Sequence, residues 1–468
     1  MKSGVHYRLI DVAGLTLVAA AEVRLQEFGV IFVTFATFHE DGIRMLKQED
    51  NERLVRVGPG TPAGELFRRY WQPALLSTEV PQPDGAPVRV RLLSEDLLAF
   101  RDSTGHVGLV AAYCPHRRAP LFYGRNEEGG IRCVYHGWKF GADGQCMDLP
   151  SEPPDSPMKS RTSIKSYPTV ERGGVVWTYM GPAAQMPPPP DYEWTRAPES
   201  HRHVSKSQQS CNYLQALEGG LDTAHASYLH NEDLGNRDRL VQRDGAPVID
   251  VHETDYGYYY VSTRNAGDQG EYVRVYHYIM PSQQMRPNAM TGKGGTGTAI
   301  PRYDGHLWVP IDDEHTHVFN WMCAYEFSPP LTPEYVERLE VRYGRGPEDF
   351  VPGTSLLKAN MENDYFIDRE KQKTKTFTGI AGINTQDLAV QEGMGAIVDR
   401  TQEHLGTSDR AIVGMRRMLL EATRAVERGE APPGVKAASH RGVRPWDGLV
   451  AKRGAWREEF EPMLVAKW

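Results

Sequence analysis

Two pairs of metal-binding residue types, set close together in the first third of the chain, constrain its fold more than any other feature. Cys114 and His116 are separated by one residue, Cys133 and His136 by two, and sixteen residues lie between the pairs. Two thiolates and two imidazoles, each pair on a tight loop, can hold one compact metal centre between the tips of two hairpins. The chain must therefore fold so that these two loops face each other.

The donor types alone admit two kinds of centre. A structural zinc site accepts two cysteines and two histidines, but its pairs are usually Cys-Cys and His-His. Here each loop supplies one cysteine and one histidine, which suits a two-iron cluster with both cysteines on one iron and both histidines on the other. The spacing therefore favours a [2Fe-2S] cluster over zinc. The other cysteines lack such company, and we expect them to be small buried residues: Cys146, Cys211 and Cys323.

A second candidate metal site follows about ninety residues later, in the stretch CNYLQALEGGLDTAHASYLH. His225 and His230 follow Asp222 with the spacing D-x2-H-x4-H. Positions five apart on a regular helix diverge by about 140°, so both imidazoles reach one ion only where the helix is distorted or ends. Gly219 and Gly220 make such a distortion easier. A lone histidine pair on a helix is more often structural or exposed than a ligand pair.

The two motifs together resemble those of the Rieske ring-hydroxylating oxygenases. The first, C-P-H-R-x15-C-x2-H-G-W, is similar to the Rieske signature, and alpha subunits of that family carry a mononuclear iron site after the cluster domain. The resemblance implies an all-β Rieske [2Fe-2S] domain followed by an α+β catalytic domain of the helix-grip (START-like) type. It also implies the ligands: Cys114, His116, Cys133 and His136 for the cluster, and His225 and His230 for Fe(II).

Iron that activates O2 needs two histidines and one carboxylate on one face, which leaves positions open for oxygen. Two stretches compete for the carboxylate: NTQDLAVQEGMG with Asp387, and ENDYFIDRE with Asp364 and Asp368. The setting Q-D-x2-V-x-E is similar to the late aspartate ligand of the family, so we favour Asp387. We expect Asp364 and Asp368 to form helix-surface pairs, for example with Arg369.

The resemblance also gives Asp222 a catalytic role. In the family an aspartate at this position links the cluster of one subunit to the iron of its neighbour by hydrogen bonds. We therefore expect Asp222 to contact His225 within a homotrimer or a hexamer of stacked trimers. The alternative interpretation is a helix-surface acid. Glu218 and Asn212 receive only packing or capping roles.

The organisation of the chain follows from its strand, helix and turn patterns. Short strand-like runs separated by turns predict a small all-β domain over about residues 88–180. Four consecutive prolines follow in AAQMPPPPDYEW and cannot continue a sheet. The remainder mixes strands with helices, expected near residues 212–230, 333–343, 388–404 and 408–427, which indicates an α+β domain. The predicted parts are an extension (1–44), a Rieske domain with a preceding helical segment (45–185), a linker (186–200), a catalytic domain (201–430) and a C-terminal tail (431–468).

The N-terminal extension has no visible link to the rest of the chain. Residues 9–38 are rich in Leu, Val and Ala, but charged residues interrupt them too often for a membrane span or a signal peptide. A polar start leading into a helix-like stretch begins at Met45. We expect an upstream, mis-assigned start.

Composition and motifs also limit the partners. The formal charge of −8 gives no broad basic surface for nucleic acid, and five cysteines in 468 residues indicate a reducing cytosol. The sequence G-K-G-G-T-G at residues 292–297 matches a dinucleotide motif only literally, because PSQQMRPNAM before it does not look like a buried strand and Pro301 prevents a following helix. We interpret it as a loop. A separate flavin and iron-sulfur NAD(P)H reductase is therefore implied.

The likeness is closest to the phthalate 4,5-dioxygenase-like branch, through GPGTPAGELFRRYWQPALL and VPIDDEHTHVFNW. It implies a terminal oxygenase that uses O2 to dihydroxylate an aromatic carboxylate. O-demethylation or other monooxygenation of a methoxylated aromatic acid is the first alternative. A Rieske electron-transfer protein, with the second domain as a docking module, is the other. Guanidinium groups bind carboxylates well, and the arginines that could do so here are Arg264, Arg274 and Arg286.

Overall fold

The computed structural model describes residues 11–12, 15–16, 45–236, 239–290 and 300–468. The chain divides into two compact units, Met1–Arg44 and Met45–Trp468. In the first unit the described residues pair β1 (Asp11–Val12) with β2 (Leu15–Thr16). The expected mis-assigned start and the expected loop at residues 292–297 therefore lie almost wholly outside the described residues. None of the described helices combines the length and the apolar character that crossing a membrane requires.

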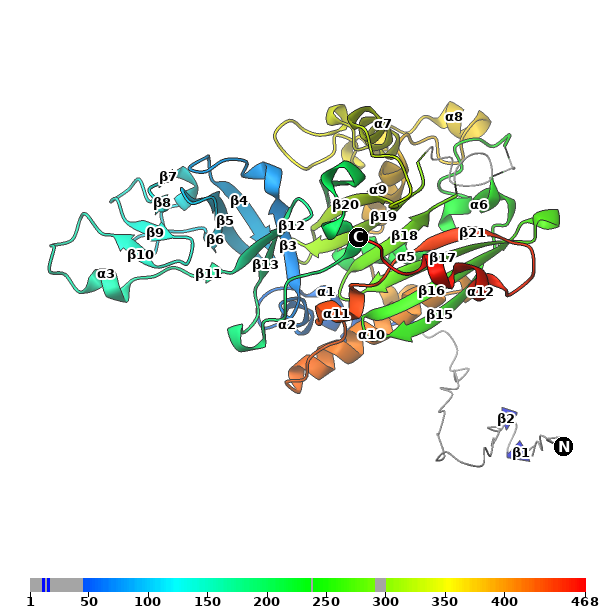
Figure 1. Ribbon diagram of the computed structural model, residues 1–468, viewed down its shortest axis with the longest axis horizontal. Helices are drawn as coiled ribbons and strands as arrows, with labels where there is room; N and C mark the ends of the chain where they lie inside the picture. The colour runs from blue at the N-terminus through cyan, green and yellow to red at the C-terminus, as the bar shows by residue number, and fades with distance from the viewer. Residues whose placement is uncertain (1–10, 13–14, 17–44, 237–238, 291–299) are drawn as a thin grey trace. The chain divides into compact units, whose positions relative to one another are not determined.

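The all-β region of the second unit consists of three antiparallel sheets, ordered β11-β6-β5-β4, β12-β13-β3 and β10-β9-β8-β7 (Figure 1). Its strands are β3 (Trp71–Leu76), β4 (Val88–Leu92), β5 (Glu95–Arg101), β6 (Val107–Ala111), β7 (Arg125–Glu127), β8 (Gly130–Arg132), β9 (Lys139–Gly141), β10 (Cys146–Asp148), β11 (Ser166–Tyr167), β12 (Thr169–Arg172) and β13 (Val175–Tyr179). The predicted all-β domain is confirmed.

Strand β5 separates two hydrophobic cores. Because successive side chains point to opposite faces of a strand, Leu97 and Ala99 join the main core whereas Leu98 and Phe100 join a smaller one. The smaller core also contains Cys114 and other buried residues of the two motif loops. The loops are thus attached to a packed β region rather than to flexible chain.

The α+β region is an antiparallel sheet of eight strands, ordered β14-β20-β19-β18-β17-β16-β15 with β21 also paired to β17. They are β14 (Arg202–Gln209), β15 (Val248–Thr254), β16 (Gly257–Asn265), β17 (Glu271–Ile279), β18 (Gln283–Asn288), β19 (Arg302–Pro310), β20 (Thr316–Ala324) and β21 (Trp446–Val450). β21 belongs to the segment 431–468, expected as a tail, and pairs with the first half of β17 while β18 pairs with its end.

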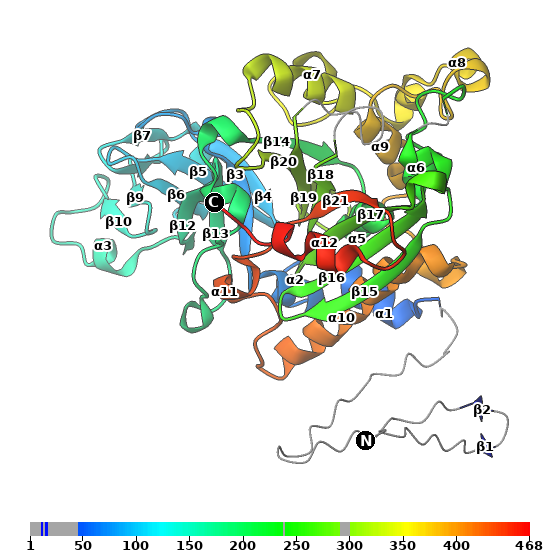
Figure 2. The ribbon, with the colours of Figure 1, turned by 45° about the vertical axis from the view of Figure 1, so that its right-hand side comes forward.

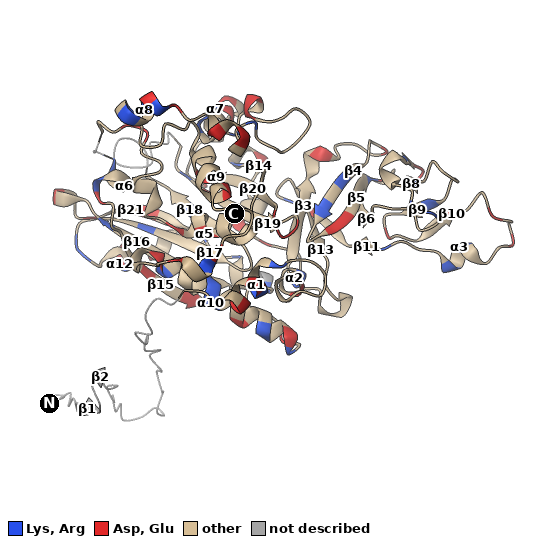
Figure 3. Ribbon diagram, turned by 180° about the vertical axis from the view of Figure 1, so that it is seen from behind, with Lys and Arg blue, Asp and Glu red and all other residues tan. Residues whose placement is uncertain are grey.

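Helices cover this sheet. The main ones are α5 (Tyr213–Leu221), α7 (Pro333–Tyr343), α9 (Ile383–Gly393) and α10 (Arg410–Glu427), and α10 lies along β15 and β16 (Figure 2). The shorter ones are α4 (Glu193–Arg196), α6 (Leu240–Arg243), α8 (Arg369–Thr374), α11 (Ala437–His440) and α12 (Trp456–Phe460), whereas α3 (Met158–Arg161) lies against β10 in the all-β region. α1 (Gln48–Val55) and α2 (Pro62–Phe67), expected with the Rieske domain, pack on α10. Charges of both signs are interspersed along α8 and α10 (Figure 3).

One expectation about the sheet is wrong. The stretch PSQQMRPNAM contains β18, which lies between β17 and β19 and is mostly buried. The sequence did not look like a buried strand because alternate residues of β18 line a polar cavity instead of an apolar core. The chain after the 292–297 motif enters strand β19 at Arg302. A dinucleotide motif would be followed by a helix, so the expectation that no helix follows this motif is confirmed.

Candidate metal centres

Two loops of similar construction carry the residues expected to hold the cluster. In each loop the cysteine N–H donates to the carbonyl five residues on, and the N–H four residues on donates back to the cysteine carbonyl, at 2.8–3.0 Å. The fourth residue after each cysteine has a left-handed φ, +61° at Arg118 and +75° at Gly137. Glycine adopts this conformation without strain. The two tight turns thereby present one cysteine and one histidine each.

The loops bring these residues together. The rings of His116 and His136 lie 4.5 Å apart between centroids, and the indole of Trp138 stacks on His116. Both cysteines are buried, and the backbone N–H of His116 hydrogen-bonds the Cys114 sulfur. Burial raises the pKa of the Cys114 thiol, and the neighbouring Cys133 adds to the effect. The thiols interact with each other and the imidazoles lie against each other, which fits a cluster with the thiolates on one iron and the histidines on the other.

The chain leaves helix α5 just before the histidine pair. The helix ends at Leu221, Asp222 is extended (φ −66°, ψ 127°), and His225 opens the short turn η5 (His225–Ser227). The two histidines can reach one ion only if the helix is distorted or ends before them. The end of α5 at Leu221 meets this requirement.

Three donor atoms converge beyond this turn. The Nε2 atoms of His225 and His230 lie 3.0 Å apart, and Asp387 Oδ1 lies 3.7 Å from the first and 3.3 Å from the second. An ion about 2.1 Å from each donor holds its ligands about 3.0–3.7 Å apart at angles of about 90–125°. The spacing fits one metal ion held by two histidines and one carboxylate, with its other side open.

The opposite ring nitrogens show where the protons are. His230 Nδ1 lies 2.8 Å from Gln386 Oε1, and Gln386 Nε2 donates to a backbone carbonyl, so the amide oxygen must face His230. His225 Nδ1 lies 3.4 Å from Asp222 Oδ2. Both Nδ1 atoms therefore donate, so both Nε2 atoms, which face Asp387, are the nitrogens left to bind a metal ion. These three converging atoms could hold a metal ion between them.

The charges of the site agree with a cation. Burial would raise the pKa of Asp387, but the adjacent histidines, His230 above all, outweigh it and lower that pKa. Burial would likewise raise the pKa of Asp222, and the hydrogen bond from His225 lowers it. Burial would lower the pKa of His225, and Asp222 outweighs burial and raises it. Two ionised carboxylates in a buried pocket suit a divalent metal ion.

Two glycines allow α5 to lie close to the other half of the donor set. A Cβ atom at Gly219 would lie 2.1 Å from the side chain of Gln391 on α9, and one at Gly220 would lie 2.1 Å from the Trp308 ring on β19. A larger residue would push α5 away from both neighbours. Because α9 also carries Asp387, the glycine pair helps to bring the two histidines and the carboxylate together.

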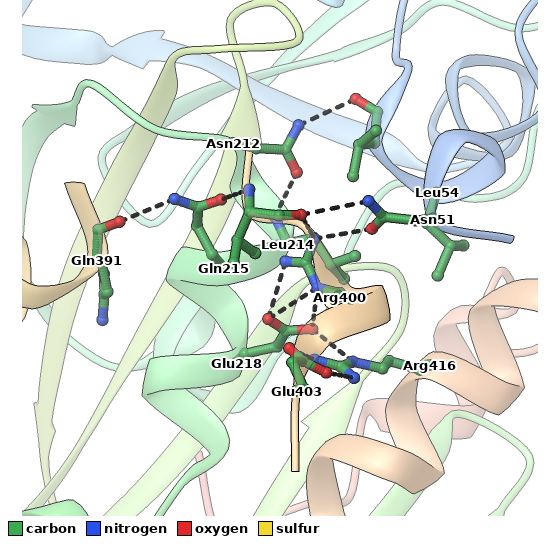
Figure 4. A network of polar contacts seen from close by, with 12 residues as sticks. Asn51, Leu54, Asn212, Leu214, Gln215, Glu218, Gln391, Arg400, Glu403 and Arg416 are labelled. Carbon is green, nitrogen blue, oxygen red and sulfur yellow. Dashed lines mark hydrogen bonds and ion pairs between the residues drawn. The ribbon is translucent and has the colours of Figure 1, made fainter. Parts of the chain in front are cut away.

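A buried charge network anchors α5 (Figure 4). Glu218 accepts hydrogen bonds from Arg400 Nε at 2.9 Å and from Arg416 Nε at 2.6 Å. Arg400 also donates to Asn51 on α1, and Arg416 on α10 donates to Glu403. Burial would raise the pKa of Glu218, and the two guanidinium groups outweigh it and lower that pKa. Charged tertiary contacts therefore hold the helix that leads to the turn with the two candidate histidine ligands, which is more than the packing role expected of Glu218.

The three donors border a cavity of about 160 Å³ between the sheet and helices α5 and α9. Strand residues of alternating register face it, among them Ser207, Asn320, His306, Trp308, Arg286 and Arg274. A strand face that lines a polar cavity is thus buried and hydrophilic at once.

The rival carboxylates lie elsewhere. Asp368 caps α8, accepting from the N–H groups of Glu370 and Lys371, and pairs with the Lys371 ammonium at 3.2 Å. Asp364 lies in the turn η8 (Met361–Phe366) with a left-handed φ of +50°. Neither belongs to the converging set.

The three candidate arginines also separate. Arg274 and Arg286 line the cavity, but Arg264 does not. The Arg264 guanidinium donates to the carbonyls of Thr223 and Asp244 and to the Ser262 hydroxyl. These bonds hold the chain between α5 and η5, which excludes Arg264 as a partner for a substrate carboxylate.

The sequence did not single out Gln386 or His306. Gln386 directly precedes Asp387, and this position was the only sequence signal for a role at the metal site. The sequence did not indicate that its side chain would reach His230. His306 stands in a strand without a motif. Only the fold places it on the cavity wall.

Comparisons with known proteins agree with the geometry. A family model described as LigXa C-terminal domain like matches residues 178–465, and that of the Rieske [2Fe-2S] domain matches residues 70–168. The 3-chlorobenzoate-3,4-dioxygenase oxygenase subunit of Comamonas testosteroni is 40% identical over 438 residues, covering 90% of this chain and 99% of that protein. The phthalate 4,5-dioxygenase oxygenase subunit of Pseudomonas putida is 38% identical over 434 residues, covering 88% and 94%. Dicamba monooxygenase bound to 3,6-dichlorosalicylic acid shares the fold, with a TM-score of 0.57 at 19% identity over 77% of this chain and 98% of that one.

Proposed function

This chain belongs to the Rieske non-heme iron oxygenases as an oxygenase subunit, and on that premise we propose that it oxygenates a small aromatic carboxylate of the phthalate type. It is an oxidoreductase that incorporates molecular oxygen. When bound, the [2Fe-2S] cluster supplies electrons and the Fe(II) site binds and activates O2. The residues proposed to hold them are the two Cys–His loops and the converging set of His225, His230 and Asp387.

The observation that supports a carboxylate substrate is that two arginine side chains, Arg274 and Arg286, line the cavity. The hydrogen bond that the Arg274 guanidinium makes among the described residues is the one from Nη2 to the Pro287 carbonyl at 2.6 Å. Arg286 lies 3.7 Å from Asp304, but Asp304 already accepts two hydrogen bonds from Arg302 and one from Asn288. Both guanidinium groups therefore keep donors for an anionic ligand, and guanidinium binds carboxylate in a bidentate geometry.

The chain's own residues have defined tasks in this function. Arg274 and Arg286 orient the acid group, so that the aromatic ring lies in the cavity beside the metal donors. Asp222 and Gln386 hold protons on the Nδ1 atoms of His225 and His230, which keeps both Nε2 atoms available as ligands.

We also propose that electrons reach the cluster from a separate NAD(P)H reductase. At the loop tips His116 is exposed, and Val134 and Tyr135 are 60% and 53% exposed, so a protein partner can approach the cluster ligands closely.

Asp222 supports the proposed homotrimer or hexamer of stacked trimers. One of its oxygens accepts from the Ala224 N–H at 2.7 Å and the other faces His225. Each oxygen has a further lone pair, and the side chain is 24% exposed. A cluster histidine of an adjacent subunit, His116 or His136, could therefore donate to it.

The oxygenation reaction has two candidates, one on the aromatic ring and one on a methoxy substituent. Dihydroxylation and O-demethylation use the same kind of iron site, and the donor geometry serves both. An electron-transfer protein would have no use for three converging donors and a cavity beside them.

Product analysis tests the proposal. The chain, coupled to a surrogate NAD(P)H reductase under 18O2, would be given phthalate, 3-chlorobenzoate, 3-methoxybenzoate and the neutral analogues toluene and anisole. We expect labelled products from the acids and turnover of the neutral analogues at least about 10-fold lower, because a hydrogen-bonded charge is worth about 1.5–3 kcal/mol. Arg286→Gln should remove this preference, whereas Arg417→Gln on the exposed face of α10 should retain it. Equal or faster turnover of the neutral compounds would refute the carboxylate substrate.

A further inference from the structure

The cavity contains a third histidine whose ring the metal donors do not use. His306 lies on β19 between the sheet and the cavity and is 5% exposed. Its Nδ1 atom lies 2.8 Å from Asn320 Oδ1 on the neighbouring strand β20. No hydrogen bond to its Nε2 atom comes from the part of the chain that the structure describes.

The hydrogen bonds of Asn320 determine which nitrogen of His306 carries the proton. Asn320 Nδ2 donates to the Val318 carbonyl and to the Ser207 hydroxyl, both at 3.2 Å. A carbonyl oxygen can only accept, so the amide nitrogen must face Val318 and the amide oxygen must face His306. His306 Nδ1 therefore donates its proton to Asn320, and Nε2 is left with a bare lone pair.

The ring is also neutral. Burial lowers the pKa of His306 far below its ordinary range, and the positive charges of Arg286 and Arg345 add to the effect. A neutral ring with a fixed proton on Nδ1 offers its Nε2 atom only as an acceptor. This contrasts with the arginines of the cavity, which offer only donors.

The Nε2 atom is open to the cavity, since it is not one of the enclosed side-chain atoms that lack a partner in the described part of the chain, and covering it with a ligand that offers no donor would cost about 1–3 kcal/mol. The lone pairs of His225 and His230 converge with Asp387 on a metal ion, whereas the converging donor set does not include His306. Its partner must therefore be a donor that enters the cavity, either water or a group of the ligand.

Resting on the proposed carboxylate function, we propose that His306 Nε2 accepts a hydrogen bond from a ring substituent of the substrate. The substrate class is then an aromatic acid that carries a second polar group with an O–H or N–H bond, such as a hydroxybenzoate or an aminobenzoate. A second carboxylate at this position would face a lone pair instead of a donor, so phthalate should bind less tightly than the best hydroxybenzoate, although the two arginines still bind its first carboxylate and it remains a substrate.

Equilibrium binding to the iron-loaded, anaerobic enzyme tests this without turnover. The probes are benzoate, its three hydroxy isomers, the corresponding methoxybenzoates and phthalate, measured by calorimetry. We expect the best hydroxybenzoate to bind about 10-fold more tightly than benzoate, since one buried hydrogen bond contributes about 1–1.5 kcal/mol. The ratio of the two affinities, rather than either affinity, is the readout.

Variants make the test specific. His306→Phe should bring the ratio to about 1, and His317→Phe, on the opposite face of β20 and not among the cavity-lining residues, should keep it. Asn320→Asp should hold a proton on both ring nitrogens and shift the preference toward methoxybenzoate, because Nε2 then donates.

Three results would overturn the inference: a ratio of about 1 in the unmodified enzyme for all isomers, an unchanged ratio in His306→Phe, or tighter binding of phthalate than of every hydroxybenzoate. Failure of the proposed function is distinguishable. If phenol binds as tightly as hydroxybenzoate, the carboxylate is not recognised, and a preference for phenol over toluene still reports on His306.

Discussion

The two proposed metal centres differ in how far apart in the sequence their candidate ligands lie. The four cluster residues lie within 23 positions, on two loops closed by the same pair of backbone hydrogen bonds. At the second site Asp387 comes 157 residues after His230, and it meets the histidines only because α9 packs against α5. Local turn geometry therefore builds the first centre, and long-range packing builds the second. Changes far from any ligand should disturb the iron site and spare the cluster.

The largest expected effect comes from breaking the network behind α5. Glu218→Gln leaves Arg400 and Arg416 buried with too little negative charge, which should destabilise the fold by about 3–5 kcal/mol. Denaturant unfolding would measure the loss, and metal analysis should show mononuclear iron falling before cluster iron.

An exposed pair provides the control for this variant. Glu421→Gln removes one of the two carboxylate partners of Arg417, the other being Glu253, and all three side chains are about half exposed, so the change should cost no more than about 1 kcal/mol. Similar losses for the two variants would show that the buried network does not hold the iron site.

The link between the centres can be weakened without removing either. Asp222→Asn keeps the shape of the side chain but removes its charge and one acceptor. We expect both metals to bind and the cluster to remain reducible, while oxidation of the reduced cluster by O2 and substrate in a single turnover slows about 100-fold. A normal rate at full metal content would make Asp222 a surface acid.

A change of packing alone should also lower the content of mononuclear iron while the cluster is retained. Gly220→Ala places a Cβ atom against the Trp308 ring, and overpacking of this kind typically costs about 1–3 kcal/mol. The matched control is Gly393→Ala at the end of α9, where nothing lies within 4 Å of the new atom. It should be neutral or stabilising by up to about 1 kcal/mol. Thermal unfolding with metal analysis would compare the two, and equal stability would contradict the close approach of α5.

The smallest effect is expected from the neutral partner of a ligand. Gln386→Leu removes the acceptor for His230 Nδ1 and should weaken iron binding about 10-fold, the lower end of the effect of such outer partners. Competitive chelation of Fe(II) measures this. The Rieske absorption should not change, and unchanged iron affinity would show that Gln386 does not orient the ring.

The sequence predicts the local features well. The Cys–His spacing, the turns and the strand runs of the β region depend on neighbours in the chain, and the structure has them as expected. The requirement that the helix end before His225 also follows from helix geometry alone, and α5 ends at Leu221.

Features created by long-range packing could not be predicted in the same way. Strand β18 is polar because it borders a cavity that exists only in the folded sheet. Arg264 and Arg286 look alike in the sequence. In the structure Arg264 donates to backbone carbonyls, whereas Arg286 lines the cavity. Three further contacts join residues that are distant in the sequence, namely Glu218 with Arg400, Gln386 with His230, and His306 with Asn320. No local sequence pattern predicts such contacts.

Iron and acid-labile sulfide analysis of the purified chain and of Asp387→Ala tests whether two separate donor sets hold two separate centres. We expect about three irons and two sulfides per chain in the unmodified protein, and about two irons and two sulfides with an intact Rieske spectrum in Asp387→Ala. Two irons in the unmodified protein, zinc without sulfide, or loss of the cluster spectrum in Asp387→Ala would contradict the assignment of two centres.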